Sequence, residues 1–325
     1  MDLRRTKSLD FSGITLYSAA NRHNLVTTEN ILTPGVSETV DFTAEGFESL
    51  TERVRAAKDG GHEIIVSIGA HVIKCGLSRY LIALAKGGYI SHFAGNGACS
   101  IHDFELAMLG GTSEHVPTAI EDGSFGMWAE TLTHMNRALK LGAEKGWGYG
   151  EALAEYIHAN PALFPHREDC VLYNMWLLDI PATYHIALGT DIIHQSPDCD
   201  MAAIGRCSGV DFKRYCYSVA HMDKGVFLNF GSAVIGAEVF LKALSIARNL
   251  GYPTFDITTA NFDLRDLGDF RKKIGYEDPD YYYRPRKNIV NRPVSRGGWG
   301  WHFAGDHVQT IPTLWKKLCA EGGHV

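Results

Sequence analysis

The densest group of side chains that could carry chemistry lies between residues 191 and 200. Asp191, His194, Asp198 and Asp200 fall within this short stretch, after a strand-like run. Carboxylates and imidazoles at this density can bind a divalent metal ion. They can equally hydrogen-bond ribose hydroxyls or a substrate amine, and a solvated loop is the alternative without a function. The pattern alone leaves these interpretations open.

A second candidate is the pair His102 and Asp103, which follows the turn Gly95-Asn96-Gly97-Ala98. A histidine near a ligand can act as a proton shuttle, because its ordinary pKa of ~6.5 is close to neutrality. Asp103 has a simpler alternative role, since an acidic side chain in the first turn of a helix interacts favourably with the helix dipole.

The C-terminal part of the chain holds a third polar concentration. Its residues are Arg284, Arg286, Lys287, Arg292, Arg296, His302, Asp306 and His307, interleaved with Gly and Trp. Arginines beside glycines and aromatic residues suit the capture of phosphate or carboxylate groups. We therefore expect Arg286, His302, Asp306 and His307 to bind substrate. A surface patch at an oligomer interface explains the same residues equally well.

The elements that must position these residues begin at Ile64. The run Ile64–Ile68 is typical of a strand buried on both faces, and it ends at Gly69. One helix is expected from Ala70 to Lys86, a strand from Tyr89 to Ala94, and a second helix from about Ile101 to Gly110. Such β-α units build parallel sheets, and open α/β sheets bind ligands at the carboxyl ends of their strands. The two glycine turns are therefore the first places to seek a site.

The rest of the chain extends the same architecture. Further strand-like runs are 182–187, 189–195, 225–230 and 254–259. Residues 123–178 read as a helical insertion, 1–41 as an irregular N-terminal arm, and 281–325 as a C-terminal segment rich in Arg, Gly and aromatic residues. We expect one α/β domain with about six mostly parallel strands and helices on both faces. An arm of this length often wraps a neighbouring subunit, so a homo-oligomer is expected.

Composition narrows the class of protein. The 325 residues are 45% hydrophobic and carry a net charge of -6, which argues against nucleic acid or an anionic membrane as a partner. The seven cysteines are spaced singly, which favours a reducing, cytoplasmic compartment. Motifs of P-loop enzymes, zinc proteases and α/β-hydrolases do not occur.

Four segments together resemble deoxyhypusine synthase, a family with a Rossmann-like NAD-binding fold. They are Ile68–Ser78, Ala94–Ala98 with His102-Asp103, Gly225–Ser232, and the run Thr258-Thr259-Ala260-Asn261-Phe262-Asp263. The family carries a lysine that forms an imine shortly after the third segment. Here Gly231 to Glu238 contains no lysine, so deoxyhypusine synthesis itself is not expected.

The resemblance implies an NAD-binding enzyme that acts on a small polar substrate by hydride transfer or by oxidation coupled to group transfer. The resemblance also implies a homo-oligomer such as a tetramer. The residues implied for the cofactor are Gly69, Ala70, Gly95, Asn96, Gly97, Asp103, Gly231 and Ser232. Those implied for catalysis are His102, Asp191, His194 and Asp263. A metal-dependent enzyme using the Asp/His cluster and a non-catalytic ligand-binding protein are the two alternatives.

Overall fold

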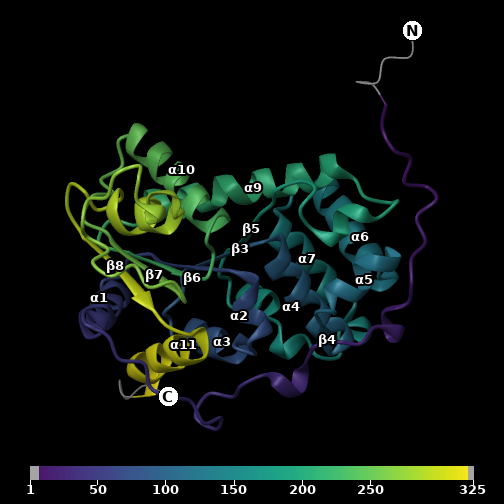
Figure 1. Cartoon of the computed structure of the whole chain (residues 1–325), viewed down its shortest axis with the longest axis horizontal. Helices are drawn as coiled ribbons and strands as arrows, with labels where there is room; N and C mark the ends of the chain where they lie inside the picture. The colour runs from purple at the N-terminus through teal and green to yellow at the C-terminus, as the bar shows by residue number, and fades with distance from the viewer. Residues whose placement is uncertain (1–6, 321–325) are drawn as a thin grey trace.

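A six-stranded parallel sheet runs through the centre of the protein (Figure 1). The structure, a computed structural model, describes residues 7–320; the outermost parts of the expected arm and C-terminal segment, residues 1–6 and 321–325, lie outside the described residues. The strands are β2 (Ile64–Ile68), β3 (His92–Asn96), β5 (Ala182–His185), β6 (Val226–Phe230), β7 (Thr258–Asp263) and β8 (Trp299–Ala304). The expected α/β, Rossmann-like fold is confirmed.

The order of the strands is β5-β3-β2-β6-β7-β8, and neighbouring strands are parallel throughout. If these six strands are counted in chain order, the sheet reads 3-2-1-4-5-6, the order of Rossmann folds. The direction in which strands are added reverses between β2 and β6. In folds with this strand order, ligands bind at the carboxyl edge, next to the loops that follow the two strands at which the order reverses.

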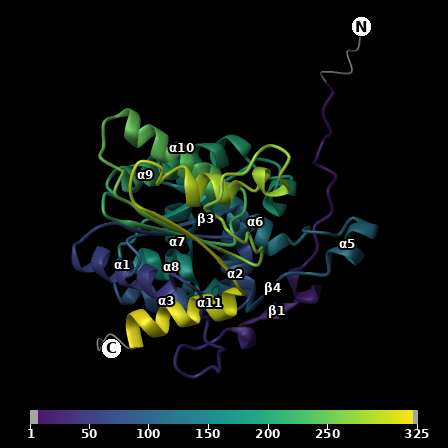
Figure 2. The same ribbon diagram turned by 60° about the vertical axis from the view of Figure 1, so that its left-hand side comes forward.

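Helices cover both faces of the sheet (Figure 2). Ile65 and Phe227 point into a core under α9 and α10, whereas Ile64, Val66 and Ile68 alternate to the opposite core. The helices are α1 (Phe47–Asp59), α2 (Ala70–Lys74), α3 (Ser78–Lys86), α4 (Gly97–Leu109), α5 (Val116–Asp122), α6 (Ala129–Lys145), α7 (Tyr149–Ala159), α8 (Val171–Leu177), α9 (Met201–Ala220), α10 (Ile235–Asn249) and α11 (His307–Trp315). Within residues 7–320, no helix has the length and apolarity needed to cross a membrane.

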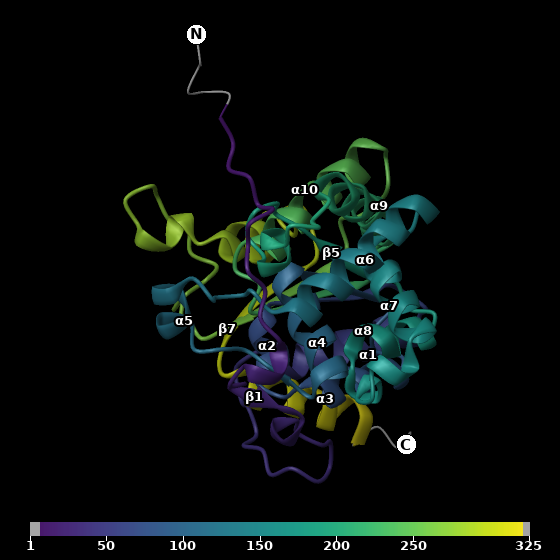
Figure 3. The same ribbon diagram turned by 90° about the vertical axis from the view of Figure 1, so that its right-hand side faces the viewer.

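Residues 123–178 contain α6, α7 and α8 and no strand, and they lie between β4 (Gly111–Thr112) and β5. From Tyr17 onward the arm before α1 packs against its own chain, and Figure 3 shows the purple arm leading down to β1 (Val26–Thr27). Within it, β1 pairs antiparallel with β4, and the Leu32 amide donates to the Gly76 carbonyl at 2.8 Å. The homo-oligomer expected from this arm stays a prediction.

Several expected elements were wrong in detail. The helix expected from 70 to 86 breaks into α2 and α3 at Gly76, whose φ is +73° and whose Cα faces the Asn30 carbonyl of the arm. The run 189–195 is a loop followed by the 3₁₀ turn Ile192–Gln195, because His194 folds back onto backbone amides. The strand expected at 254–259 lies at Thr258–Asp263, and β8 takes the sixth place in the sheet.

Because two histidines are buried, we expect the folded protein to lose stability in acid. His92 contacts the hydroxyls of Ser218 and Thr183 at 2.8 and 2.9 Å, and Thr183 also contacts His185 at 3.4 Å. Burial lowers the pKa of His92 to about 3 and that of His185 to about 4. Their neutral forms stabilise the fold above the unfolded pKa of ~6.5, and this contribution is lost as pH falls toward the folded values. Each histidine should remove about 2 kcal/mol between pH 7.5 and 5.

Urea unfolding at the two pH values tests this expectation. His92→Gln should lose less stability on acidification than the wild type, because one of the two coupled protonations is gone. An identical loss in both proteins would contradict the assignment.

Candidate functional site

The carboxyl edge of the sheet brings the predicted glycine turns together at the point where the strand order reverses. The Gly69 amide donates to the Phe230 carbonyl at 2.7 Å, and the Gly231 amide donates to the Phe262 carbonyl at 3.0 Å. The two loops approach so closely that a Cβ atom on Gly69 would lie 2.4 Å from the Gly231 carbonyl oxygen. Glycine at position 69 is therefore required by the packing of one loop against the other.

Three helices begin at this edge, next to the predicted cofactor residues. Ala70 is the first residue of α2, Asn96 caps α4 by accepting from the Cys99 amide at 3.0 Å, and Ser232 Oγ accepts from the Gly236 amide of α10 at 2.9 Å. Gly95 is on β3 and Gly97 opens α4. Amides at helix starts favour anions such as a pyrophosphate. Gly69, Ala70, Gly95, Asn96, Gly97, Gly231 and Ser232 all lie on these turns.

Asp103 does not belong to this group. It lies in the second turn of α4, and its carboxylate accepts from the amides of Val171 and Leu172 at 2.9 and 2.8 Å and from the Cys170 thiol. The side chain is 1% exposed and caps the start of α8. These contacts engage both carboxylate oxygens in holding the start of α8, and binding of the cofactor by Asp103 stays a prediction.

A cavity of about 230 Å³ lies beside the start of α4. Its lining includes Lys74, His102, Glu114 and Asp191. The Asp191 carboxylate rests against Gly97, where a Cβ atom would overlap it. Asp191 Oδ2 and Glu114 Oε2 are both buried without a hydrogen-bond partner among the described residues. Two unpartnered carboxylate oxygens on one cavity call for a donor, and a ligand ammonium group would supply it.

The two carboxylates are held differently. Glu114 Oε1 accepts from the Gly126 amide at 3.0 Å and from the Trp128 indole at 2.9 Å, which fixes that side chain. Asp191 Oδ2 has no partner among the described residues, and burial raises the pKa of Asp191 to about 6. Glu114, which sequence reasoning missed, belongs to no motif.

His102 lines the same cavity, as its predicted catalytic role requires. Its Nδ1 contacts the Thr112 hydroxyl at 2.7 Å. Burial lowers the pKa of His102 to about 4, so the ring is neutral at pH 7. A neutral imidazole with one nitrogen facing a cavity can accept a proton from a bound ligand.

The His194 side chain shapes the loop that presents Asp191, because it hydrogen-bonds to backbone amides of that loop. Its Nδ1 accepts from the amides of Gly189 and Asp191 at 3.2 and 3.1 Å, which folds the loop that presents Asp191. Its Nε2 is buried and unpartnered within the described residues. A catalytic role for His194 stays a prediction, and the contacts themselves describe a turn-forming residue.

A row of buried polar side chains crosses the sheet below the start of α10. Ser67, Asn229, Asn261 and His302 occupy one register across β2, β6, β7 and β8. Asn229 Nδ2 donates to Asn261 Oδ1 at 2.7 Å, and Asn261 Nδ2 approaches His302 Nδ1 at 3.0 Å. The two asparagines were not predicted, although each interrupts an apolar strand just before a phenylalanine.

Asp263 ends β7 beside this row. Its Oδ2 accepts from the Tyr283 hydroxyl at 2.5 Å, and burial with this hydrogen bond raises the pKa of Tyr283 above its ordinary value. Asp263 is half-buried and lies at the carboxyl edge, but on the far side of the switch point from the cavity. The structure therefore does not bring Asp263 together with His102 and Asp191.

The predicted substrate residues of the C-terminal segment separate into different roles. Arg286 is 3% exposed and donates to the carbonyls of Asp269 and Lys272, so it holds a loop. His302 uses both ring nitrogens, on Asn261 and on the Arg265 carbonyl. Substrate binding by His302 is not supported, because neither ring nitrogen is left for a ligand. Arg286 keeps a buried Nε without a partner among the described residues, so its role in substrate binding stays a prediction.

The last two predicted residues flank the start of α11. Asp306 is exposed and caps this helix by accepting from the Val308 amide at 3.1 Å. His307 lies over the switch point, where its Nε2 would be 2.6 Å from a Cβ atom on Gly231, and its buried Nδ1 has no partner among the described residues. Of the four, His307 alone faces the loops after β2 and β6.

The part of the chain that the structure describes contains no group of three or more His, Cys, Asp or Glu side chains arranged to hold a metal ion. Asp198 and Asp200 do not join Asp191 and His194: Asp200 caps α9 by accepting from the amides of Ala202 and Ala203.

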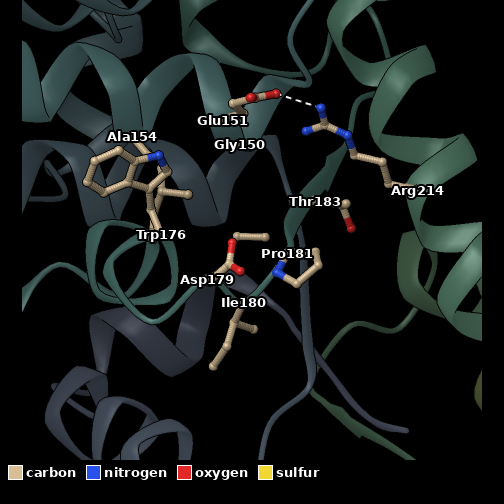
Figure 4. A pocket seen from close by; sticks show the side chains of 11 residues that line it. Gly150, Glu151, Ala154, Trp176, Asp179, Ile180, Pro181, Thr183 and Arg214 are labelled. Carbon is tan, nitrogen blue, oxygen red and sulfur yellow. Dashed lines mark ion pairs between the residues drawn. The ribbon is translucent and has the colours of Figure 1, made fainter.

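A larger cavity of about 470 Å³ lies elsewhere, at the amino end of the edge strand β5 (Figure 4). Trp176, Asp179 and the ion pair of Glu151 with Arg214 line it. None of the predicted site residues reaches this cavity, and no side chain that lines it is buried with an unpartnered polar atom among the described residues. The larger volume of this cavity does not by itself make it the better candidate for the functional site.

Comparison with solved structures supports the fold. The chain is similar to the arginine dihydrolase ArgZ of the ornithine–ammonia cycle in cyanobacteria, with a TM-score of 0.50 and 18% identity over 86% of this chain and 33% of that one. It is similar to AgrE in a ternary complex with ornithine and NAD+, with a TM-score of 0.51 and 16% identity over 88% of this chain and 35% of that one. It is also similar to a conserved putative LOR/SDH protein from Methanococcus maripaludis S2, with a TM-score of 0.50 and 15% identity over 89% of this chain and 74% of that one.

The chain thus spans about a third of the length of ArgZ and AgrE. These likenesses establish the Rossmann-like fold and do not single out deoxyhypusine synthase. No protein-family model and no curated protein sequence matches the chain.

Asp191→Asn should stabilise the protein in a pH-dependent way. Burial raises the pKa of Asp191 from 3.8 to about 6, so the folded protein keeps this carboxyl protonated where the unfolded chain ionises it. Burial of the carboxyl therefore costs no stability below pH 3.8, and the wild type loses stability as pH rises from 3.8 toward about 6. The asparagine variant avoids this ionisation, so it should be more stable by about 1–3 kcal/mol above pH 7 and unchanged near pH 4.

Chemical unfolding at pH 4 and pH 8 measures the difference. Asp198→Asn, in the same segment but outside the cavity lining, is the matched control. Equal effects of Asp191→Asn at both pH values would show that the carboxyl is not held in a desolvated position.

Proposed function

We propose that this chain is an NAD-dependent enzyme that acts on a small substrate carrying an amino group. The observation that carries the proposal is the reversal of strand order between β2 and β6, with glycine turns and helix starts gathered at that edge. Dinucleotides bind at such a switch point in this class of fold. AgrE, which has the same fold, was solved with NAD+ and ornithine, and this supports the choice of cofactor.

The helix starts at the switch point would favour the negative charge of a pyrophosphate. The starts of α4 and α10 would offer backbone amides, and Gly69, Gly97 and Gly231 lie on the adjoining turns. Ala70 and Ser232 complete this group. Bound NAD+ would supply the hydride acceptor.

The substrate would lie in the cavity beside α4, one strand from the switch point. Asp191 and Glu114 would receive its ammonium group through their unpartnered oxygens. His102 would take a proton from the substrate nitrogen when the neighbouring C–H bond gives up its hydride. Whether the oxidised product is released or passed on by group transfer depends on the substrate.

Isothermal titration with NAD+ tests the cofactor, followed by assays for amine oxidation with ornithine and arginine as the first probes. We expect NAD+ to bind with a Kd below ~1 mM, in the usual range of enzyme ligands, and an amine to bind more tightly in its presence. Absence of NAD+ binding would overturn the proposal. Binding of NAD+ without turnover of any amine would favour a ligand-binding protein instead.

A further inference from the structure

We propose that Thr112, Glu105 and Arg22 form a positioning chain that fixes His102 as the tautomer with its proton on Nδ1 and its free lone pair on Nε2 facing the cavity. The role of His102 as a proton acceptor rests on the proposed function. The tautomer itself follows from the contacts of the protein alone.

The tautomer of His102 follows from the number of hydroxyl and ring protons available along the positioning chain. Arg22 Nη1 and Glu105 form an ion pair of 2.7 Å with side chains only 2% and 1% exposed, so Glu105 is a carboxylate that accepts hydrogen bonds. The Thr131 hydroxyl donates to Glu105 Oε1 at 2.7 Å, and the Thr112 hydroxyl donates to Oε2 at 2.5 Å.

Thr112 has only one proton to give. Because Glu105 receives it, the Thr112 oxygen must act as an acceptor toward His102 Nδ1 at 2.7 Å, and Nδ1 must carry the ring proton. His102 Nε2 has no partner among the described residues, and it is not among their buried unpartnered atoms. It is therefore the unprotonated nitrogen and opens on the cavity.

The positioning chain also includes a residue of the N-terminal arm. Arg22 comes from the arm, and its Nη2 donates to the Gly111 carbonyl at 3.3 Å. Thr112 lies on β4, directly opposite Val26 of β1 in the arm. Figure 2 shows β1 and β4 side by side below the body of the sheet. The arm thus holds both the guanidinium and the strand that carries Thr112.

The chemical consequence is a directed proton acceptor. When the N–H bond of a bound ammonium group breaks, its electron pair stays on the substrate nitrogen and the proton forms a new bond to His102 Nε2. The resulting imidazolium keeps its Nδ1–H bond to Thr112, and the Glu105 carboxylate stabilises the positive charge through that hydroxyl. Thr112 and Glu105 are positioning residues in this scheme, since neither has to touch the substrate.

NMR of the ring nitrogens tests the proposal on the unliganded full chain with ¹⁵N-labelled histidine at pH 7.5. The His102 signals, assigned by their loss in His102→Gln, should show Nδ1 protonated and Nε2 unprotonated. Thr112→Val removes the acceptor and should shift the population to the Nε2–H tautomer, whereas Thr112→Ser should keep the wild-type pattern.

An Nε2–H tautomer in the wild type would overturn the inference, and so would a pattern in Thr112→Val that matches the wild type. If Thr112→Val fails to fold, the wild-type and Thr112→Ser spectra still decide the question. Because no cofactor or substrate is present, this result is independent of NAD+ binding: the tautomer can be wrong while the proposed function stands, and the reverse.

Discussion

Replacing Ala70 with aspartate is expected to weaken NAD+ binding at least ~100-fold while leaving the protein folded. Ala70 is the half-buried first residue of α2, directly after the Gly69 turn. An acidic side chain at the start of a helix is favourable for the helix itself. The same charge would face the pyrophosphate at the switch point, and like charges a few ångströms apart near a protein surface repel by several kcal/mol.

Isothermal titration of Ala70→Asp measures this loss, and thermal unfolding confirms that the variant is folded. Ala202→Asp is the matched control, because Ala202 is an exposed residue in the first turn of α9 and lies far from the switch point. It should bind NAD+ as the wild type does. Undiminished binding by Ala70→Asp would place the cofactor elsewhere.

The second large effect is expected from His102→Gln. Glutamine can keep a hydrogen bond to Thr112, so the cavity should retain its shape, but it cannot take a proton. Turnover of the amine substrate should fall by ~10²-fold or more, the usual contribution of a general base, with little change in Kd for NAD+.

Steady-state kinetics together with NAD+ titration separate these quantities. His221→Gln is the control, since His221 is exposed directly after α9, and its Nδ1 contacts the Tyr217 carbonyl. Equal turnover in the wild type and His102→Gln would remove His102 from the mechanism.

The central strands of the fold were predictable because they are buried on both faces. Residues 64–68 and 226–230 are apolar except for Ser67 and Asn229, and the structure places the two runs side by side in the sheet. The strand at 258–263 was misplaced because its polar residues Thr258, Thr259 and Asn261 are buried. The Thr259 hydroxyl donates to the Ile289 carbonyl, and Asn261 pairs with Asn229 and His302 inside the sheet. The final strand alternates glycine and tryptophan, a pattern that periodicity does not separate from a loop.

Only those site residues that lie in loops directly after the sheet strands could be predicted. Gly69, Gly97 and Gly231 meet because parallel strands end at the same edge, so their position follows from the fold. Arg22 and Glu114 come from the arm and from the segment after α4, and only the folded chain brings them to His102. Arg286 could not be placed from sequence either: this charged residue is buried and donates to the carbonyls of Asp269 and Lys272 in an earlier loop.

Hydrogen–deuterium exchange with and without NAD+ tests the central claim most directly, because it locates the cofactor on the unmodified protein. We expect added protection in residues 69–75, 96–100 and 231–237, around the point where the strand order reverses, and none in 176–183 beside the larger cavity. Protection confined to 176–183, or no protection anywhere at saturating NAD+, would contradict the account.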